Sequence, residues 1–198
     1  MSDKTVEYYN ANAEKFVEST LSVDFSQVQC EFLNLLRTES YILDFGCGSG
    51  RDTKYFLEHG YQVDAVDGSM ELCRIASEFT GIEVRQMLFQ ELQEKEKYDG
   101  IWACASILHV PKIELADILQ KMCNAVKVDG VIYISFKYGN FEGEQNGRFF
   151  SDFTEKSFCE FVKNIQELCI QKMWITGDVR DGRGDERWLN IILRRKMC

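Results

Sequence analysis

The sequence predicts an α/β fold, a mainly parallel sheet with helices on both faces, and three observations support this. Short apolar segments alternate with amphipathic ones from Tyr41 to Phe136. Such alternation is typical of βαβ units, whose right-handed crossovers make successive strands parallel. The chain has 198 residues, 45% of them apolar, which is enough for a single domain with a sizeable core. A glycine-rich turn directly follows the first apolar segment, as expected at the ligand-binding edge of such a sheet.

Before that first segment, the pattern predicts two amphipathic helices. Residues 4–19 place Tyr8, Tyr9 and Phe16 among charged residues, and residues 25–36 place apolar side chains on one face. We expect residues 1–38 to form a helical lid over the sheet.

The alternating part, residues 41–136, is expected to be the binding core. Its predicted strands are 41–45, 61–66, 82–84 with an extension to 87 left open, 101–104 and 131–136. Its predicted helices are 52–59, ended by Gly60, a helix from the N-cap Ser69 to about 79, and 111–126. An Asp129-Gly130 turn is expected to precede the fifth strand.

The remaining residues, 137–198, are expected to supply the substrate side. Residues 138–150 read as a glycine-rich loop, followed by a helix that Thr154 caps and that runs to about 163. Two final strands, 168–176 and 188–194, have only a polar loop between them and should therefore pair antiparallel.

Composition excludes several classes of protein. The net charge of −9 argues against a broad cationic face for duplex nucleic acid, so a nucleic-acid partner is not expected. No apolar run reaches the ~18 residues of a membrane span, and the N-terminus lacks a signal-peptide core. The eight cysteines are scattered without metal-ligand spacing, so no metal site is expected. We expect a cytoplasmic protein with reduced cysteines.

The strongest motif is the strand–acid–glycine sequence LDFGCGSG at residues 43–50. Its glycines, among them Gly46 and Gly48, let the backbone turn sharply and approach a ligand closely. The spacing GxGxG differs from the GxGxxG of dinucleotide sites, and the acid Asp44 would repel a pyrophosphate. The same carboxylate suits a ligand with an ammonium or sulfonium group.

A second acid, Asp67, ends the next strand, 19 residues after Gly48. A carboxylate at this distance can accept hydrogen bonds from both hydroxyls of a ribose. Gly68 allows close approach, and Met70 is placed to pack on a purine. The residues thus favour a zwitterionic nucleoside over a dinucleotide.

Four segments resemble motifs of the class I S-adenosylmethionine-dependent methyltransferases, within these the small bacterial group near the tellurite-resistance type: LDFGCGSGRDT, AVDGS, YDGIWACASILHV and GVIYISFKYG. The resemblance implies a Rossmann-like seven-stranded sheet in the order 3-2-1-4-5-7-6, with strand 7 antiparallel, and S-adenosylmethionine as cofactor. It also implies the cofactor contacts: Asp44, Gly46 and Gly48 at the methionine end, Asp67 at the ribose, Met70 and Phe89 beside adenine, the backbone of Leu88 at the adenine edge, Ala103 beside the methionine, and Tyr8 as a covering aromatic. Many relatives have an acid in place of Leu88; a backbone oxygen or Gln90 would have to replace its contact.

Downstream residues are candidates for the acceptor side. His109 follows the fourth strand and is a candidate general base or a structural histidine. Lys137, Arg148 and Arg187, with Arg180 and Arg183, could converge on an anionic acceptor or form salt bridges with nearby acids at the surface.

The resulting hypothesis is methyl transfer to a small-molecule acceptor by in-line displacement, in which positioning supplies most of the catalysis. The alternatives are a methyltransferase acting on a protein or tRNA, and a cofactor-binding regulatory protein without turnover.

Overall fold

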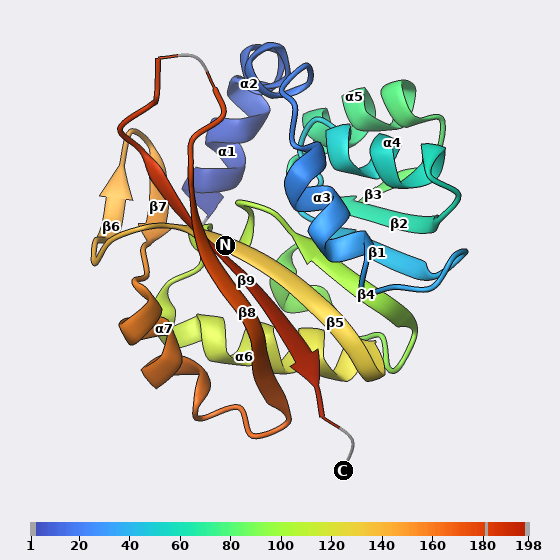
Figure 1. The fold of residues 1–198 in the computed structure, drawn as a ribbon. Helices are drawn as coiled ribbons and strands as arrows, with labels where there is room; N and C mark the ends of the chain where they lie inside the picture. The colour runs from blue at the N-terminus through green and yellow to red at the C-terminus, as the bar shows by residue number, and fades with distance from the viewer. Residues whose placement is uncertain (1–2, 181, 197–198) are drawn as a thin grey trace.

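The computed structural model describes residues 3–180 and 182–196 (Figure 1). Its strands are β1 Tyr41–Phe45, β2 Gln62–Asp67, β3 Val84–Gln86, β4 Tyr98–Ala103, β5 Val126–Lys137, β6 Glu142–Gln145, β7 Arg148–Ser151, β8 Leu168–Gly177 and β9 Arg187–Arg195. Its α-helices are α1 Asp3–Ala11, α2 Ala13–Thr20, α3 Ser26–Leu33, α4 Arg51–Glu58, α5 Met70–Thr80, α6 Lys112–Ala125 and α7 Glu155–Val162.

Seven strands form one sheet in the order β3-β2-β1-β4-β5-β9-β8. Strands β1 to β5 are parallel, whereas β9 runs antiparallel to both β5 and β8. The penultimate and last strands of this sheet correspond to the two strands that the sequence predicts at the C-terminal end. The predicted Rossmann-like order, with an antiparallel last strand, is therefore confirmed.

The core has two layers because successive side chains of a strand point to opposite faces of the sheet. Ile42 and Trp102 face the apolar side of α3 and the α4 residue Phe56. Their neighbours Leu43 and Ile101 face the opposite layer, which includes buried residues of α6 and α7. Figure 1 shows α3 and α4 on one side of the sheet and α6 on the other.

Three local expectations are corrected. The helix expected over 4–19 divides into α1 and α2 at Asn12, whose side-chain Nδ2 donates to the Tyr8 carbonyl at 2.8 Å and shares that oxygen with the Asn12 N–H at 3.1 Å. The loop expected over 138–150 contains the hairpin β6–β7. Its tip is Asn146-Gly147, and both residues have positive φ, 51° and 78°, as the tight turns of hairpins require.

The third correction concerns the Asp129-Gly130 turn, which does not precede the fifth strand but lies inside it. Strand β5 already pairs with β4 at Val126, and the register shifts before the Gly100–Val131 pair. Asp129, with φ of 64°, therefore marks an irregularity within the strand. Separately, none of the helices in the described ranges is both long enough and apolar enough to cross a membrane.

Candidate functional site

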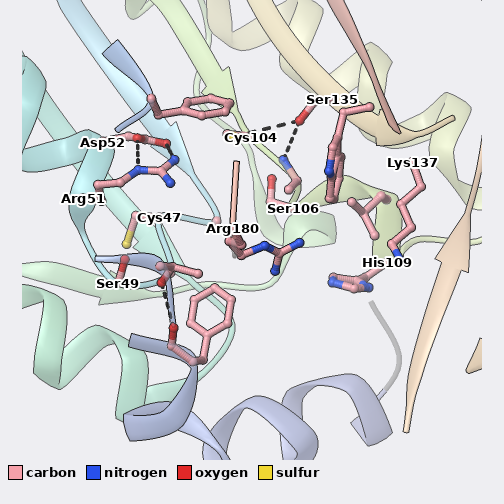
Figure 2. A pocket seen from close by; sticks show the side chains of 18 of the residues that line it. Cys47, Ser49, Arg51, Asp52, Cys104, Ser106, His109, Ser135, Lys137 and Arg180 are labelled. Atoms are coloured by element: carbon pink, nitrogen blue, oxygen red, sulfur yellow. Dashed lines mark hydrogen bonds and ion pairs between the residues drawn. The ribbon is translucent and has the colours of Figure 1, made fainter. Parts of the chain in front are cut away.

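A cleft lies over the carboxyl ends of β1, β2, β4 and β5, where ligands bind in open α/β sheets (Figure 2). Helices α1 and α2 supply one wall through Tyr9 and Phe16, and the tip of the β8–β9 hairpin supplies another. The space between these walls measures about 1270 Å³ when the solvent at its open mouth is included.

The floor of the cleft is the glycine loop between β1 and α4. Gly46 has φ of 89°, and a Cβ built on it would lie 2.4 Å from the Cβ of Ser106. Gly48 has φ of 56°, and its Cβ would lie 2.9 Å from the Phe16 ring. Both positions therefore require glycine for conformation as well as for space. The loop leaves a cradle of bare backbone beside the ends of β1 and β2.

Asp67 lies at the carboxyl end of β2 and lines the cleft, although only 8% of its surface is exposed. Its Oδ2 accepts the Gly48 N–H and its Oδ1 accepts the Ser69 N–H, both at 2.9 Å. Burial raises the pKa of Asp67, and these backbone donors oppose that rise. A carboxylate can accept about four hydrogen bonds, so acceptor capacity remains toward the cavity.

Asp44 lies behind the glycine loop and does not line the cleft directly. It is 2% exposed and accepts a hydrogen bond from Thr53 Oγ1 at 2.6 Å. Burial, followed by the nearby Asp52 carboxylate, raises the pKa of Asp44 to about 8. Its effect on a ligand is therefore electrostatic, through the loop.

The sequence reasoning missed Asp52, which lines the cleft at the start of α4. Its carboxylate accepts hydrogen bonds from Gln29 Nε2 at 2.7 Å, Trp102 Nε1 at 2.8 Å and Arg51 Nε at 2.7 Å. It thereby ties α3 and β4 to the glycine loop. The sequence contained a signal for this residue, because Arg51 and Asp52 directly follow the glycine loop.

Of the residues that the resemblance assigns to the adenine and methionine ends, some line the cleft and others do not. Gly68 and Phe89 line it, and the Phe89 ring packs on Phe45 with centroids 4.8 Å apart. Met70 is 61% exposed and lies outside the lining, and Ala103 is fully buried. Cys104 and Ala105, the next residues, line the cleft in its place.

At the expected adenine edge, the N–H of Leu88 donates to the Glu91 carboxylate at 2.7 Å. The neighbouring Gln90 donates through Nε2 to Glu114 at 3.3 Å. Its Oε1 is buried and has no hydrogen-bond partner among the described residues. Gln90 therefore has an unpaired acceptor, although this residue lies outside the lining of the cleft.

Tyr9, not Tyr8, lines the cleft on the α1 side, and it forms a hydrogen bond with His109. Tyr9 Oη lies 2.8 Å from His109 Nε2, and His109 Nδ1 lies 2.6 Å from the Phe149 carbonyl oxygen. Since a carbonyl only accepts, Nδ1 carries the proton and neutral Nε2 accepts from the Tyr9 hydroxyl. Burial lowers the pKa of His109 to about 3, so the ring stays neutral. Both ring nitrogens of His109 are thus occupied, and the Tyr9 oxygen, which accepts from Arg148 Nη1 at 3.4 Å, keeps one lone pair for a further donor.

Cationic side chains gather at the other end of the cleft, as the sequence suggests. Lys137, Arg148, Arg180 and Arg183 line it, and Figure 2 shows Arg180 extending into the cavity toward His109. Arg187 lies outside this lining and packs over the Tyr138 ring at 4.9 Å. The expected convergence therefore includes Lys137 and Arg148 but not Arg187.

Ion pairs hold part of this cationic end in place. Arg180 pairs with Asp178, whose other partner is Trp188 Nε1 at 3.0 Å. Although burial opposes it, hydrogen bonds from Arg180 lower the pKa of Asp178 to about 2. Lys137 pairs with Glu186 at 2.9 Å. The tip of the β8–β9 hairpin is thus fixed across the cleft.

Comparison with known proteins gives matching results. Residues 42–130 match the model of a methyltransferase domain. A protein of Staphylococcus carnosus described as an uncharacterized methyltransferase is 27% identical over 149 residues, which cover 70% of this chain and 71% of that protein.

Solved structures share the fold. The 1,6-didemethyltoxoflavin-N1-methyltransferase of Burkholderia thailandensis, with bound 1,6-didemethyltoxoflavin and S-adenosylhomocysteine, aligns with a TM-score of 0.79 at 20% identity, over 98% of this chain and 88% of that one. TehB of Haemophilus influenzae aligns with a TM-score of 0.72 at 16% identity, over 93% and 67%. Residues 42–130 thus match a methyltransferase domain, and the chain shares the strand order and the fold of S-adenosylmethionine-dependent methyltransferases.

Proposed function

We propose that the protein transfers the methyl group of S-adenosylmethionine to a small-molecule acceptor bound in the same cleft. The observation that carries the proposal is that one walled cleft has two chemically different ends. One end offers bare glycine backbone and the Asp67 carboxylate, and the other offers Lys137 and Arg148. The Burkholderia methyltransferase that shares the fold holds a small heterocycle together with S-adenosylhomocysteine, which supports a small acceptor here.

The carboxylate end fits the cofactor on chemical grounds. A Cβ at Gly46 or Gly48 would fill the cradle, and Asp67 keeps acceptor capacity for the two ribose hydroxyls. Asp44 suits a ligand with positive charge, because its pKa of about 8 leaves it mostly protonated near neutral pH and a bound cation would favour its ionised form. We therefore assign Gly46, Gly48 and Asp44 to the methionine end and Asp67 to the ribose.

The proposed adenine contacts come from residues that follow Asp67 in the chain. Gly68 and Phe89 line the cleft and are assigned to this end, whereas Gln90 lies outside the lining, so its contact with the adenine amine stays a prediction. The contacts that resemblance gives to Met70, Leu88, Ala103 and Tyr8 stay predictions.

The chain's contribution to the reaction is positioning. Bound S-adenosylmethionine supplies a methyl group that its sulfonium already activates. The walls of the cleft hold the acceptor in line with it and exclude water, which can contribute on the order of 7–11 kcal/mol. Because the Tyr9 proton points to His109, the Tyr9 oxygen can accept a hydrogen bond from an N–H or O–H of the acceptor. In this assignment His109 is a positioning residue for Tyr9.

The test is incubation of the protein with methyl-labelled S-adenosylmethionine and, separately, a small-molecule extract, total tRNA and total protein. We expect label in the small-molecule fraction only, and we expect Asp67→Asn to abolish it. Label in tRNA or protein would refute the small-molecule acceptor. Tight S-adenosylmethionine binding with no transfer to any fraction would instead support a regulatory protein.

A further inference from the structure

Arg148, the first residue of β7, places a guanidinium in the acceptor end of the cleft with few partners of its own. Its Cζ lies over the rings of Tyr8 at 4.5 Å, Phe150 at 5.1 Å and Tyr9 at 5.8 Å. Among the described residues, its side chain makes one hydrogen bond, from Nη1 to Tyr9 Oη at 3.4 Å. Its Nε is buried and has no acceptor among residues 3–180 and 182–196. A guanidinium has five N–H donors, so most of those of Arg148 are unused.

The other cations of the cleft differ from Arg148 because each has a carboxylate partner. These pairs are Arg51–Asp52, Lys137–Glu186, Arg180–Asp178 and Arg183–Glu186. Within the part of the chain that the structure describes, no carboxylate pairs with Arg148. The acceptor end therefore keeps an uncompensated positive charge in a chain whose net charge is −9.

A partly buried cation without a counter-ion is costly, so its retention calls for an explanation. Aromatic rings stabilise a guanidinium through its faces but use none of its N–H groups. The donors stay available at the edge of the guanidinium, where an oxyanion binds through two parallel hydrogen bonds.

The position of Arg148 relative to Tyr9 links this charge to the reaction. Tyr9 Oη contacts Arg148 Nη1, and it lies close enough to Asp67 for that carboxylate to influence the pKa of Tyr9. Tyr9 thus stands between the proposed ribose site and Arg148. An acceptor anchored on Arg148 would extend past Tyr9 toward the cofactor.

We propose that the methyl acceptor carries an oxyanion group, a carboxylate or a phosphate, and that Arg148 binds it through its free N–H donors. The inference rests on the proposed function and names the acceptor class for the same cleft. Lys137 and Arg180 add positive potential but are already paired, so Arg148 is the principal ligand.

The test uses the full chain loaded with S-adenosylhomocysteine and titrated with benzoate, phenyl phosphate and neutral benzamide by calorimetry. We expect benzoate or phenyl phosphate to bind about tenfold or more tightly than benzamide, as hydrogen bonds to charged groups predict. Comparison of the two anions separates a carboxylate from a phosphate acceptor. Arg148→Met should remove the preference, and Arg148→Lys should retain part of it.

The matched control is Lys172→Met. Lys172 also lies over an aromatic ring, Trp174 at 5.0 Å, but outside the cleft, so this variant should keep the preference. The anion inference is overturned if neither anion binds the loaded protein, if benzamide binds equally well, or if Arg148→Met keeps the preference. Failure of the wild-type protein to bind S-adenosylhomocysteine at all, measured on the same samples, would refute the proposed function instead. Thermal unfolding of each variant shows whether it is folded.

Discussion

Replacement of Asp67 by asparagine is the sharpest test of the proposed cofactor site. The carboxylate uses one oxygen for Gly48 N–H and the other for Ser69 N–H, both at 2.9 Å. An amide has only one accepting oxygen, so its NH₂ group would face one of these backbone donors. The variant also loses the charge that strengthens hydrogen bonds from the ribose hydroxyls. Each such bond is worth about 1.5–3 kcal/mol, so two at the lower value amount to about 3 kcal/mol, or roughly 100-fold in Kd.

The assay is calorimetric titration with S-adenosylhomocysteine. The matched control is Asp64→Asn, the same substitution on the same strand, since Asp64 is bonded outside the cleft to Tyr41 Oη, Lys97 Nζ and Tyr98 Oη. Asp64→Asn should lower the free energy of unfolding but leave the affinity within about twofold. If Asp67→Asn binds S-adenosylhomocysteine as tightly as the wild type, the ribose assignment is wrong.

Three other predictions follow from the same site. Gly46→Ala should destabilise the protein by about 3 kcal/mol in urea denaturation, because of positive φ and a 2.4 Å clash, whereas Gly60→Ala, with φ of 83° but open space, should cost about 1 kcal/mol. Burial raises the pKa of Asp44 to about 8, so binding of the positively charged cofactor should lower that pKa and release a proton. The affinity for S-adenosylmethionine should therefore rise with pH up to about 8. Calorimetry in two buffers of different ionisation enthalpy should detect the released proton in the wild type but not in Asp44→Asn. Since the pKa of His109 is lowered to about 3, the methyl-transfer rate should show no histidine titration between pH 5 and 8, and a rate that follows a pKa near 6.5 would contradict the assigned tautomer. Tyr9→Phe should lower kcat without weakening cofactor binding.

The sequence predicted the sheet well because its signals are local and repeated. Most of the parallel strands contain a short apolar segment that ends where a helix or turn signal follows; β3, Val84–Gln86, overlaps the expected 82–84 only at Val84. Ser69 caps α5 by accepting the Leu72 N–H, and Thr154 caps α7 through Ser157, both as expected. The missed β6–β7 hairpin had a local signal as well, the Asn146-Gly147 pair.

The walls of the cleft were harder to predict because they depend on packing between distant segments. Tyr8 and Tyr9 are adjacent on α1 and point about 100° apart, so the rotation of the helix decides which one faces the cleft. Buried Thr5, four residues before Tyr9 and therefore on the same face, accepts the Phe149 N–H at 3.2 Å and sets that rotation. A contact across 144 positions of sequence leaves no local pattern.

The two ends of the cleft are built from different parts of the sequence, and this affects how new activities could arise. The glycine loop, Asp67 and Phe89 come from the first half of the chain. Lys137 ends β5, whereas Arg148 lies in the β6–β7 hairpin and Arg180 in the β8–β9 hairpin. Hairpin tips tolerate substitution and insertion better than sheet interiors do. Exchange of the β6–β7 and β8–β9 tips between relatives should therefore redirect acceptor choice while the methyl-donor half keeps its affinity, which makes these tips the natural targets for directed evolution.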